Sequence, residues 1–469
     1  MVSTKTPPDP VHLPAEADRV SLEGIHGSVA VPHSSEGFFR QWRAFIGPAL
    51  LVSVGYMDPG NWGTDLQGGA QFKYGLLWVV ALASLMAIFL QVISARLGIA
   101  TGKDLVQCCH DWYPRWTRLP NWLLAEVAVG ACDLAEVLGS AVALNLLFHI
   151  PLLWAVLITG LDVLLLLALQ GFGMRTIEAV VLLLVSTIAA CYCIEIFVLP
   201  QTHPEFLEMG RALLVPGLRQ AGMIYVAIGI IGATVMPHNL YLHSALVQSR
   251  NFQRDEASLR KAVRFNTIDT VVALSIAFVI NAAILVLAAM VFFGKDSVLV
   301  PGGQLVRFTP ASDWIRIAFL TLAPLLGAGV ASTLFAVALL ASGQSSTITG
   351  TLAGQVVMEG FMNWRIRPWL RRLITRTMAI VPAVLVIGLH GDASVTDLLT
   401  LSQVVLALQL PFAMFPLLQF ACSRRRMGAW KIGRFLTVAG WGSAILVTAM
   451  DLYGLPDLLE TAWRVVVGP

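Results

Sequence analysis

Two short stretches of the chain combine a proline with side chains that can bind a metal ion. One reads Asp58-Pro59-Gly60-Asn61 and the other reads Met236-Pro237-His238-Asn239, so both fit the pattern X-Pro-x-Asn. The carboxylate of Asp58 and the amide oxygen of Asn61 suit many cations, whereas the thioether of Met236 favours softer transition metals over Mg²⁺ and Ca²⁺. Together these side chains predict a site for a divalent transition metal ion.

Each proline also interrupts the helix around it and releases a backbone carbonyl. Proline has no N–H and its ring clashes with the carbonyl four residues earlier, so Pro59 releases the carbonyl of Gly55 and Pro237 releases that of Ala233. Both carbonyls join the predicted ligand set, because an unsatisfied carbonyl in lipid is costly and a cation can satisfy it. The two helix C-termini each add about half a negative charge. With Asp58 the total is roughly two, which suits a divalent cation.

A second group of ionisable residues lies on one predicted helix. Glu126 and Asp133 are seven residues apart and Glu136 follows three later, so all three carboxylates share one side of an apolar helix. They predict a proton relay or partners for basic groups. Arg371 and Arg372 are candidates for those partners. The alternative is that the two arginines form a cytoplasmic flank under the positive-inside rule.

Three more polar residues stand inside apolar sequence. His238 lies beside the predicted ligands and could pass or sense a proton near neutral pH. His243 is interpreted as a packing histidine, and Asn281 is a candidate for a gating role.

The elements that position these residues are membrane-spanning helices. The chain has 469 residues, of which 57% are hydrophobic and 13% charged, with a mean hydropathy of +0.75. Soluble domains carry about 25% charge. The long apolar runs lack the alternation of barrel strands, so a polytopic all-α membrane protein in contact with the lipid bilayer is predicted. The net charge of +3 gives no argument for nucleic acid. The absence of HExxH, Walker and GxSxG motifs predicts that the chain is not an enzyme.

Eleven spans are predicted, approximately over 44–72, 75–99, 120–148, 152–170, 176–199, 219–249, 267–293, 317–342 (with helix continuing to about 360), 369–389, 393–421 and 434–453. Residues 1–40 are predicted to form a disordered cytoplasmic tail without a cleavable signal peptide, and residues 41–469 to form the transmembrane domain. Most of the 31 Lys and Arg fall in segments that share a side with the N-terminus. The N-terminus is therefore predicted inside and the C-terminus outside.

The two interrupted helices occupy corresponding places in two predicted repeats. Repeat one covers about 44–199 and repeat two about 219–421, with an extra helix at about 434–453. Five spans per repeat means that the second repeat enters the membrane from the opposite side. Paired proline- or glycine-interrupted spans in such repeats indicate the binding site of a transporter at the membrane midplane.

The motifs "YMDPGN" (56–61), "GACDLAE" (130–136), "GIIGATVMPHNLYLHS" (229–244), "FAVALLASGQSSTITGT" (335–351) and "WLRRLIT" (369–375) resemble those of the Nramp (natural resistance-associated macrophage protein) family, in particular its bacterial proton-dependent manganese transporters. The resemblance covers about residues 40 to 455. It implies eleven transmembrane helices in the inverted-repeat leucine-transporter fold, with helices 1 and 6 broken. It further implies import of Mn²⁺, and also of Fe²⁺ and Cd²⁺, by proton-coupled symport across the cell (inner) membrane. No cofactor is expected, and the chain is expected to act as a monomer.

The resemblance also assigns residues. Family ligands fall on Asp58, Asn61, Met236 and the carbonyl of Ala233, and the family glutamine of helix 10 falls on Gln403. Gly55 stands where the family usually has an alanine, which leaves the backbone ligand in place. Thr234 lies close enough to orient water. The matching acid and arginines of the family form a proton exit path, which supports that role for Asp133, Glu136, Arg371 and Arg372.

Two other functions stay open at this point. A magnesium or other divalent cation transporter related to the family would share most of these features, but Met236 argues against it. An organic-substrate symporter of the same fold is less consistent with Asp58 and Met236, which suit an ion better than an amine or a carboxylate.

Overall fold

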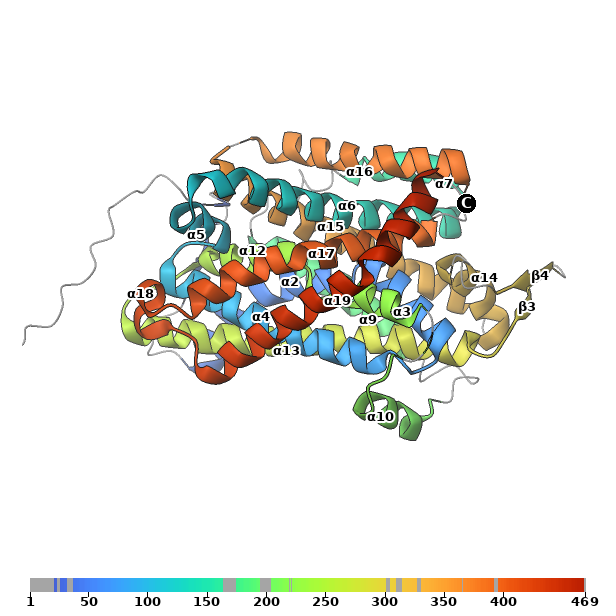
Figure 1. Cartoon of the computed structure of the whole chain (residues 1–469), viewed down its shortest axis with the longest axis horizontal. Coiled ribbons are helices and arrows are strands. Elements are labelled where there is room, and N and C mark those ends of the chain that lie inside the picture. Colours follow the sequence, from blue (N-terminus) through green and yellow to red (C-terminus); the bar gives the residue numbers. More distant parts are fainter. Residues whose placement is uncertain are drawn as a thin grey trace, which may run out of the picture.

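The structure is a computed structural model, and it describes residues 21–22, 26–31, 37–162, 174–194, 204–218, 220, 222–300, 304–308, 314–326, 330–364, 366–391 and 395–467. Most of its helices run along one common axis, and α19 crosses them obliquely (Figure 1). In chain order the helices that form the bundle are α2 (Pro48–Gly55), α3 (Pro59–Phe72), α4 (Leu77–Thr101), α6 (Arg118–Phe148), α7 (Leu152–Thr159), α9 (Met174–Cys193), α11 (Met223–Val235), α12 (Pro237–Leu246), α13 (Glu256–Phe292), α15 (Val330–Met362), α16 (Pro368–His390), α17 (Val395–Ala421) and α19 (Arg434–Val467).

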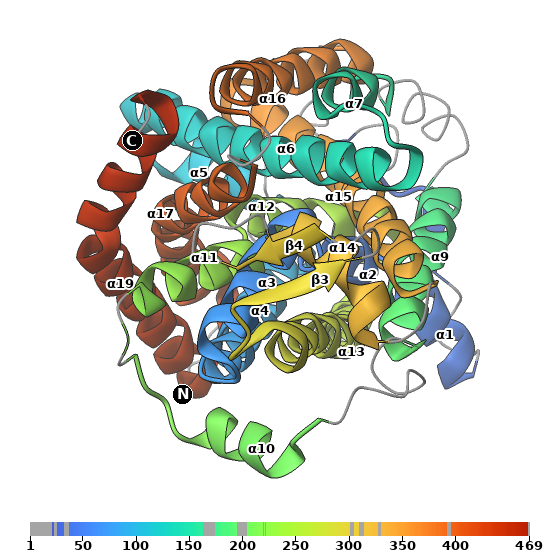
Figure 2. The same ribbon diagram turned by 90° about the vertical axis from the view of Figure 1, so that its right-hand side faces the viewer.

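The remaining elements lie around this bundle. At one end are α1 (Phe38–Phe45), α5 (Leu105–Trp112), α18 (Arg424–Met427) and the parallel pair β1 (Val29–Ala30) and β2 (Arg250–Asn251). At the other end are α14 (Trp314–Leu326) and the antiparallel pair β3 (Ser297–Val300) and β4 (Gln304–Arg307), and α10 (Phe206–Leu214) lies at the side of the bundle. Seen along the bundle axis, α3, α11 and α12 lie centrally, with α6, α7 and α16 on one side and α13 on the other (Figure 2).

The chain leaves helical geometry at both X-Pro-x-Asn stretches. α2 ends at Gly55 and α3 begins at Pro59, and the Asp58 carboxylate caps α3 by accepting a 2.8 Å hydrogen bond from the Asn61 N–H. α11 ends at Val235 and α12 begins at Pro237. Between them Met236 has φ +38°, which is uncommon for a residue with a side chain and stores backbone strain.

Among the described residues, nine helical segments are long and apolar enough to cross a membrane, so this is a multi-pass membrane protein. The first predicted span corresponds to α2 and α3 together. The fourth, 152–170, lies within the described residues only as far as residue 162.

One predicted span has a wrong boundary. The seventh predicted span, 267–293, lies almost entirely within α13, which starts earlier at Glu256, because Asp255 caps it by accepting from the Ser258 N–H and the charged turns continue the helix. The eighth predicted span starts at 317, but α14 is a separate helix and α15 starts at Val330. Ser332 of α15 donates a hydrogen bond to the Phe319 carbonyl, so α14 folds back on α15. Hydropathy does not report where an apolar chain reverses direction.

Part of the predicted disordered tail is packed against the bundle. Val29–Ala30 pairs with Arg250–Asn251, and the Leu22 N–H donates to Glu359 at 3.0 Å. Leu22 and Val29 are both buried. The polar, proline-rich composition of this tail predicts disorder. Composition cannot reveal that a strand from a distant part of the chain pairs with it.

Candidate metal-binding site and carboxylate–arginine network

The oxygens of three predicted ligands converge on one point between the two interruptions. The Asn61 amide nitrogen donates to Asp58 Oδ1 at 3.0 Å, to the Ala233 carbonyl at 3.2 Å and to the Gly55 carbonyl at 3.4 Å. Pro237 has no N–H, so the Ala233 carbonyl lacks its helical partner and is free for Asn61 of α3. Asp58 is fully buried, and its Oδ2 has no hydrogen-bond partner among the described residues.

The sulfur of Met236 lies beside this point. Met236 is fully buried and accepts a hydrogen bond from the Asn239 amide nitrogen at 3.3 Å. A Cβ on Gly55 would lie 3.2 Å from the Met236 sulfur and 2.3 Å from the Asn239 nitrogen. Gly55 therefore lets α2 approach α12 closely, and the Met236 sulfur lies near Gly55.

Two more predicted residues border the site. A Cβ on Gly60 would meet the Gln403 side chain at 2.1 Å, so Gln403 of α17 lies against the first turn of α3. Gln403 donates to the Ser402 hydroxyl, and its Oε1 has no partner among the described residues. Thr234 donates to Asn61 Oδ1 at 3.5 Å. Within the described part of the chain, no group of three or more His, Cys, Asp and Glu could hold a metal ion. The binding capacity of this region comes instead from one carboxylate with carbonyl, amide and thioether groups.

The carboxylates of α6 meet the arginines of α16 in ion pairs. Arg371 contacts Glu126 at 2.9 Å, and Arg372 contacts Asp133 at 2.5 Å and Glu136 at 3.5 Å. Arg371 is 5% exposed and Arg372 2%. Arg371 and Arg372 are therefore buried partners of the carboxylates of α6.

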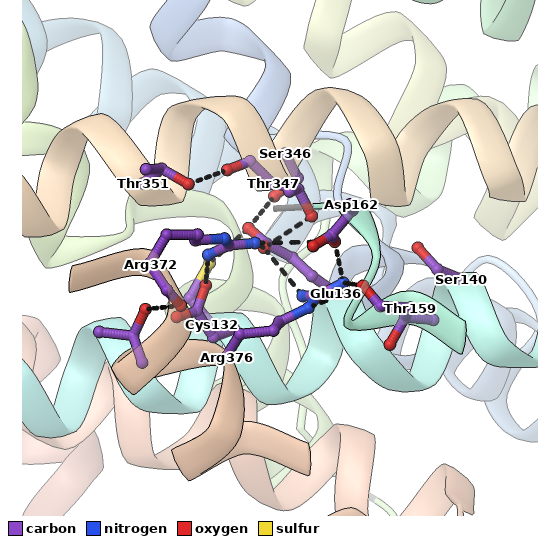
Figure 3. Close-up of polar contacts among 12 residues, drawn as sticks. Cys132, Glu136, Ser140, Thr159, Asp162, Ser346, Thr347, Thr351, Arg372 and Arg376 are labelled. Atoms are coloured by element: carbon purple, nitrogen blue, oxygen red, sulfur yellow. Dashed lines mark hydrogen bonds and ion pairs between the residues drawn. The ribbon is translucent and has the colours of Figure 1, made fainter. Parts of the chain in front are cut away.

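Sequence reasoning missed two members of this network. Figure 3 shows Arg376 of α16 with Asp162, just after α7, close to Arg372 and Glu136. Arg376 forms an ion pair with Asp162 and lies 3.8 Å from Glu136, and Arg372 lies 3.9 Å from Asp162. An ionisable residue inside an apolar span is a functional candidate by default, and that signal was present at both positions.

Hydroxyl groups of α15 complete the surroundings of Glu136. Ser346 donates to Glu136 Oε1 at 2.8 Å and Thr347 to Oε2 at 3.0 Å. Glycines bring the helices this close. A Cβ on Gly350 would meet Glu136 at 2.8 Å, and one on Gly354 would meet Arg371 at 1.9 Å. Small residues allow such close contacts between membrane helices.

The metal-binding region and the network are joined through Gly139. A Cβ at Gly139 would lie 2.1 Å from Pro59 Cβ, so α6 touches α3 directly at the residue that follows Asp58. Glu136 is one helical turn from this contact. The predicted metal ligand Asp58 and the predicted carboxylates of α6 therefore lie next to each other in the bundle.

The remaining predicted polar residues support the interruption of α2 and α3. Asn281 donates to the Tyr56 carbonyl at 2.7 Å, and His243 Nδ1 lies 3.0 Å from Gln91 Oε1. Gln91 donates in turn to the Tyr56 hydroxyl at 2.7 Å. His238 is buried beside Met236, and its Nδ1 has no partner among the described residues.

The geometry has counterparts in known proteins. A family model described as natural resistance-associated macrophage protein-like matches residues 49–456. The divalent metal cation transporter MntH of Nostoc sp. is 49% identical over 451 residues, which cover 95% of this chain and 97% of the relative. The protein of the same name from Xanthomonas campestris pv. campestris is 50% identical over 445 residues, covering 94% and 97%.

Solved structures also resemble this chain. The structure of the Eremococcus coleocola manganese transporter is 38% identical to this chain, with a TM-score of 0.82 over 95% of this chain and 96% of that one. The nucleobase-cation-symport-1 family transporter MHP1 shares the fold alone, with 14% identity and a TM-score of 0.57. Since the family model spans most of the sequence and the relatives match nearly end to end, this chain belongs to the Nramp family.

Proposed function

We propose that this chain imports divalent transition metal ions, Mn²⁺ foremost and also Fe²⁺ and Cd²⁺, together with protons. The observation that carries the proposal is the convergence of Asp58, Asn61, the Gly55 and Ala233 carbonyls and Met236 between two interrupted helices. The relatives named as divalent metal cation and manganese transporters support the same substrate class. The function is transport rather than catalysis.

The Asn61 side chain marks where the ion binds. Its amide nitrogen contacts three oxygens that a cation would contact instead. On metal binding we expect the amide to turn, so that Oδ1 faces the ion and completes a set of oxygen ligands. Met236 adds the sulfur, and Gln403 reaches the site as α17 approaches α3.

The thioether of Met236 favours transport of a transition metal ion over transport of Mg²⁺. Mg²⁺ takes oxygen ligands in near-ideal octahedral geometry, and a sulfur ligand offers it nothing. Mn²⁺ accepts a mixed set, and soft Cd²⁺ gains most from sulfur.

Alternating access follows from the two interruptions. We infer an inverted repeat of five plus five transmembrane helices and one further helix, with helix 1 formed by α2 and α3 and helix 6 by α11 and α12. The half-helices on either side of the ion can then move separately and open the site to one side at a time. The basic residues near α5, α13 and α18 support a cytoplasmic position for that end of the bundle, and with it for the N-terminus.

The carboxylate–arginine network is our proposed proton route. Asp133, Glu136 and Asp162 face the two guanidiniums of Arg372 and Arg376, so the cluster has one carboxylate in excess. One proton can therefore be held there without breaking an ion pair. The contact of Gly139 with Pro59 places this cluster one helix away from Asp58, and Glu126 with Arg371 extends it along α6.

The test is uptake of radioactive Mn²⁺ into proteoliposomes, with and without an inward proton gradient. Asp58→Ala should abolish uptake and leave folding intact, because it removes the only full charge of the site. Asp296→Asn, which neutralises an exposed carboxylate near β3, is the matched control. Uptake by a folded Asp58→Ala protein at the control rate would refute the site. Gradient-independent uptake by the wild type would refute proton coupling.

A further inference from the structure

A basic pocket lies at the α5 and α18 end of the bundle. Its volume is about 390 Å³, and it is lined by Arg96 of α4, by Arg260, Val263 and Arg264 of α13, and by Trp430. Neither the metal site nor the proton route uses any of these residues.

The charges of the pocket favour an anion. Arg96 has a buried Nε without a partner among the described residues, while its Nη2 donates to the Lys431 carbonyl at 3.4 Å. Arg260 is paired with Glu256 at 2.8 Å, but Arg264 forms no ion pair within the described chain. Three guanidiniums therefore face a single carboxylate.

The pocket continues into an apolar, lipid-facing surface. α4 packs against both α13 and α19, which lie beside it in Figure 1. On α4, Phe89 and Leu85 lie seven and eleven residues before Arg96, on the same side of the helix and toward the membrane interior. Leu85 is 48% exposed. Phe435 of α19 is 71% exposed and stacks edge-on against Phe89, with ring centroids 5.7 Å apart.

The depth of the pocket matches the headgroup layer. α13 has 37 residues and so is about 55 Å long, against a hydrocarbon core of about 30 Å. Arg260 and Arg264 lie in its first turns, before the apolar stretch that includes the exposed Val271. An indole such as that of Trp430 is typical of this interfacial layer.

We propose that this pocket binds the phosphate headgroup of an anionic phospholipid, whose acyl chains lie along α4 between α13 and α19. Basic pockets between membrane helices bind such headgroups. A free phosphate compound would satisfy the arginines equally well, but it would not use the apolar surface that leads from the pocket. The proposal does not depend on which metal the chain transports.

The experiment compares lipid binding to the purified full-length chain by native mass spectrometry. Phosphatidylglycerol and phosphatidylcholine with the same acyl chains are the probes, and glycerol 3-phosphate is the soluble competitor. The test variant is Arg260→Gln with Arg264→Gln. The matched control is Arg424→Gln with Arg425→Gln, which removes the same charge from exposed positions at the same end of the bundle.

We expect wild type and control to prefer phosphatidylglycerol, and the test variant to bind it about thirty-fold more weakly, because each arginine near a membrane surface contributes about fivefold. Undiminished binding in the test variant, or an equal loss in the control, would overturn the site. Displacement of phosphatidylglycerol by an equal concentration of glycerol 3-phosphate would overturn the lipid as its occupant. Both arginines of the test variant are exposed, so folding is expected to be retained.

Discussion

Gly139→Ala tests whether direct contact between α6 and α3 is needed for transport. The added methyl group would lie 2.1 Å from Pro59 Cβ and 2.3 Å from Pro59 Cγ. Both atoms belong to a ring at the start of α3, so neither can rotate away. α6 and α3 must therefore separate, and the carboxylate network of α6 moves away from Asp58.

The size of the effect follows from packing distances. Carbon atoms pack at about 3.5–4.0 Å, so the two helices must part by about 1.5 Å. Overpacking of this kind costs about 1–3 kcal/mol. Alanine also recovers up to about 1 kcal/mol of helix propensity relative to glycine. We expect a net loss of stability and a fall in Mn²⁺ uptake of at least about tenfold, which corresponds to 1.4 kcal/mol.

The assay is proton-driven Mn²⁺ uptake into proteoliposomes, together with the melting temperature of the purified protein. Gly130→Ala on the same helix is the control, because a Cβ there has no neighbour within 4 Å. It receives the same propensity gain without the clash and should transport like the wild type. If Gly139→Ala matches Gly130→Ala in both uptake and melting temperature, the close α6–α3 contact has no functional role and the coupling argument fails.

Three further predictions concern single side chains. Asp133→Asn should slow proton flux more than it weakens Mn²⁺ affinity, because Asp133 pairs with Arg372 on a helix separate from the ligands; equal damage to both would place it in the metal site. Met236→Ala should keep reduced Mn²⁺ transport, lose Cd²⁺ affinity and admit Ca²⁺ or Mg²⁺ as competitors. If neither ion competes with Mn²⁺ uptake in that variant, cavity geometry sets selectivity instead. Asp65→Asn should raise the melting temperature, because Asp65 is buried and neither carboxylate oxygen has a partner among the described residues. A lower melting temperature would show that this carboxylate makes a stabilising interaction.

The main features of the site could be predicted from the sequence because its chemistry is local. A proline fixes which carbonyl is released, four residues earlier, so Gly55 and Ala233 follow directly from Pro59 and Pro237. Asp58 and Met236 stand out because ionisable or soft-ligand side chains beside a helix break are rare in apolar sequence. Helical periodicity likewise puts Glu126, Asp133 and Glu136 on one side of α6.

Partners that come from distant parts of the chain could not be derived in the same way. Gln403 entered only through the family resemblance, and Arg376 with Asp162 was missed altogether. A pairing across the bundle depends on which helix faces turn toward each other, and no local pattern encodes that choice. The start of α15 was also misplaced, because α14 and α15 are both apolar and only their contact through Ser332 shows where the chain turns back.

The sequence by itself thus determined that the chain lies in a lipid bilayer, that it is helical, where its two helices are interrupted and which kind of ion their side chains suit. Each of these properties depends on composition, periodicity or the covalent geometry of proline. Only the tertiary structure decided which groups share a site. Asn61 of α3 reaches the Ala233 carbonyl of α11, and Arg372 of α16 contacts both Asp133 and Glu136 of α6. Glycines contribute to this packing, because Gly139 lets α6 approach α3, Gly350 lets α15 approach α6, and Gly229 of α11 lies against Thr64 of α3. A glycine in the sequence indicates that another helix can pack closely at that position, but only the tertiary structure shows which helix does so.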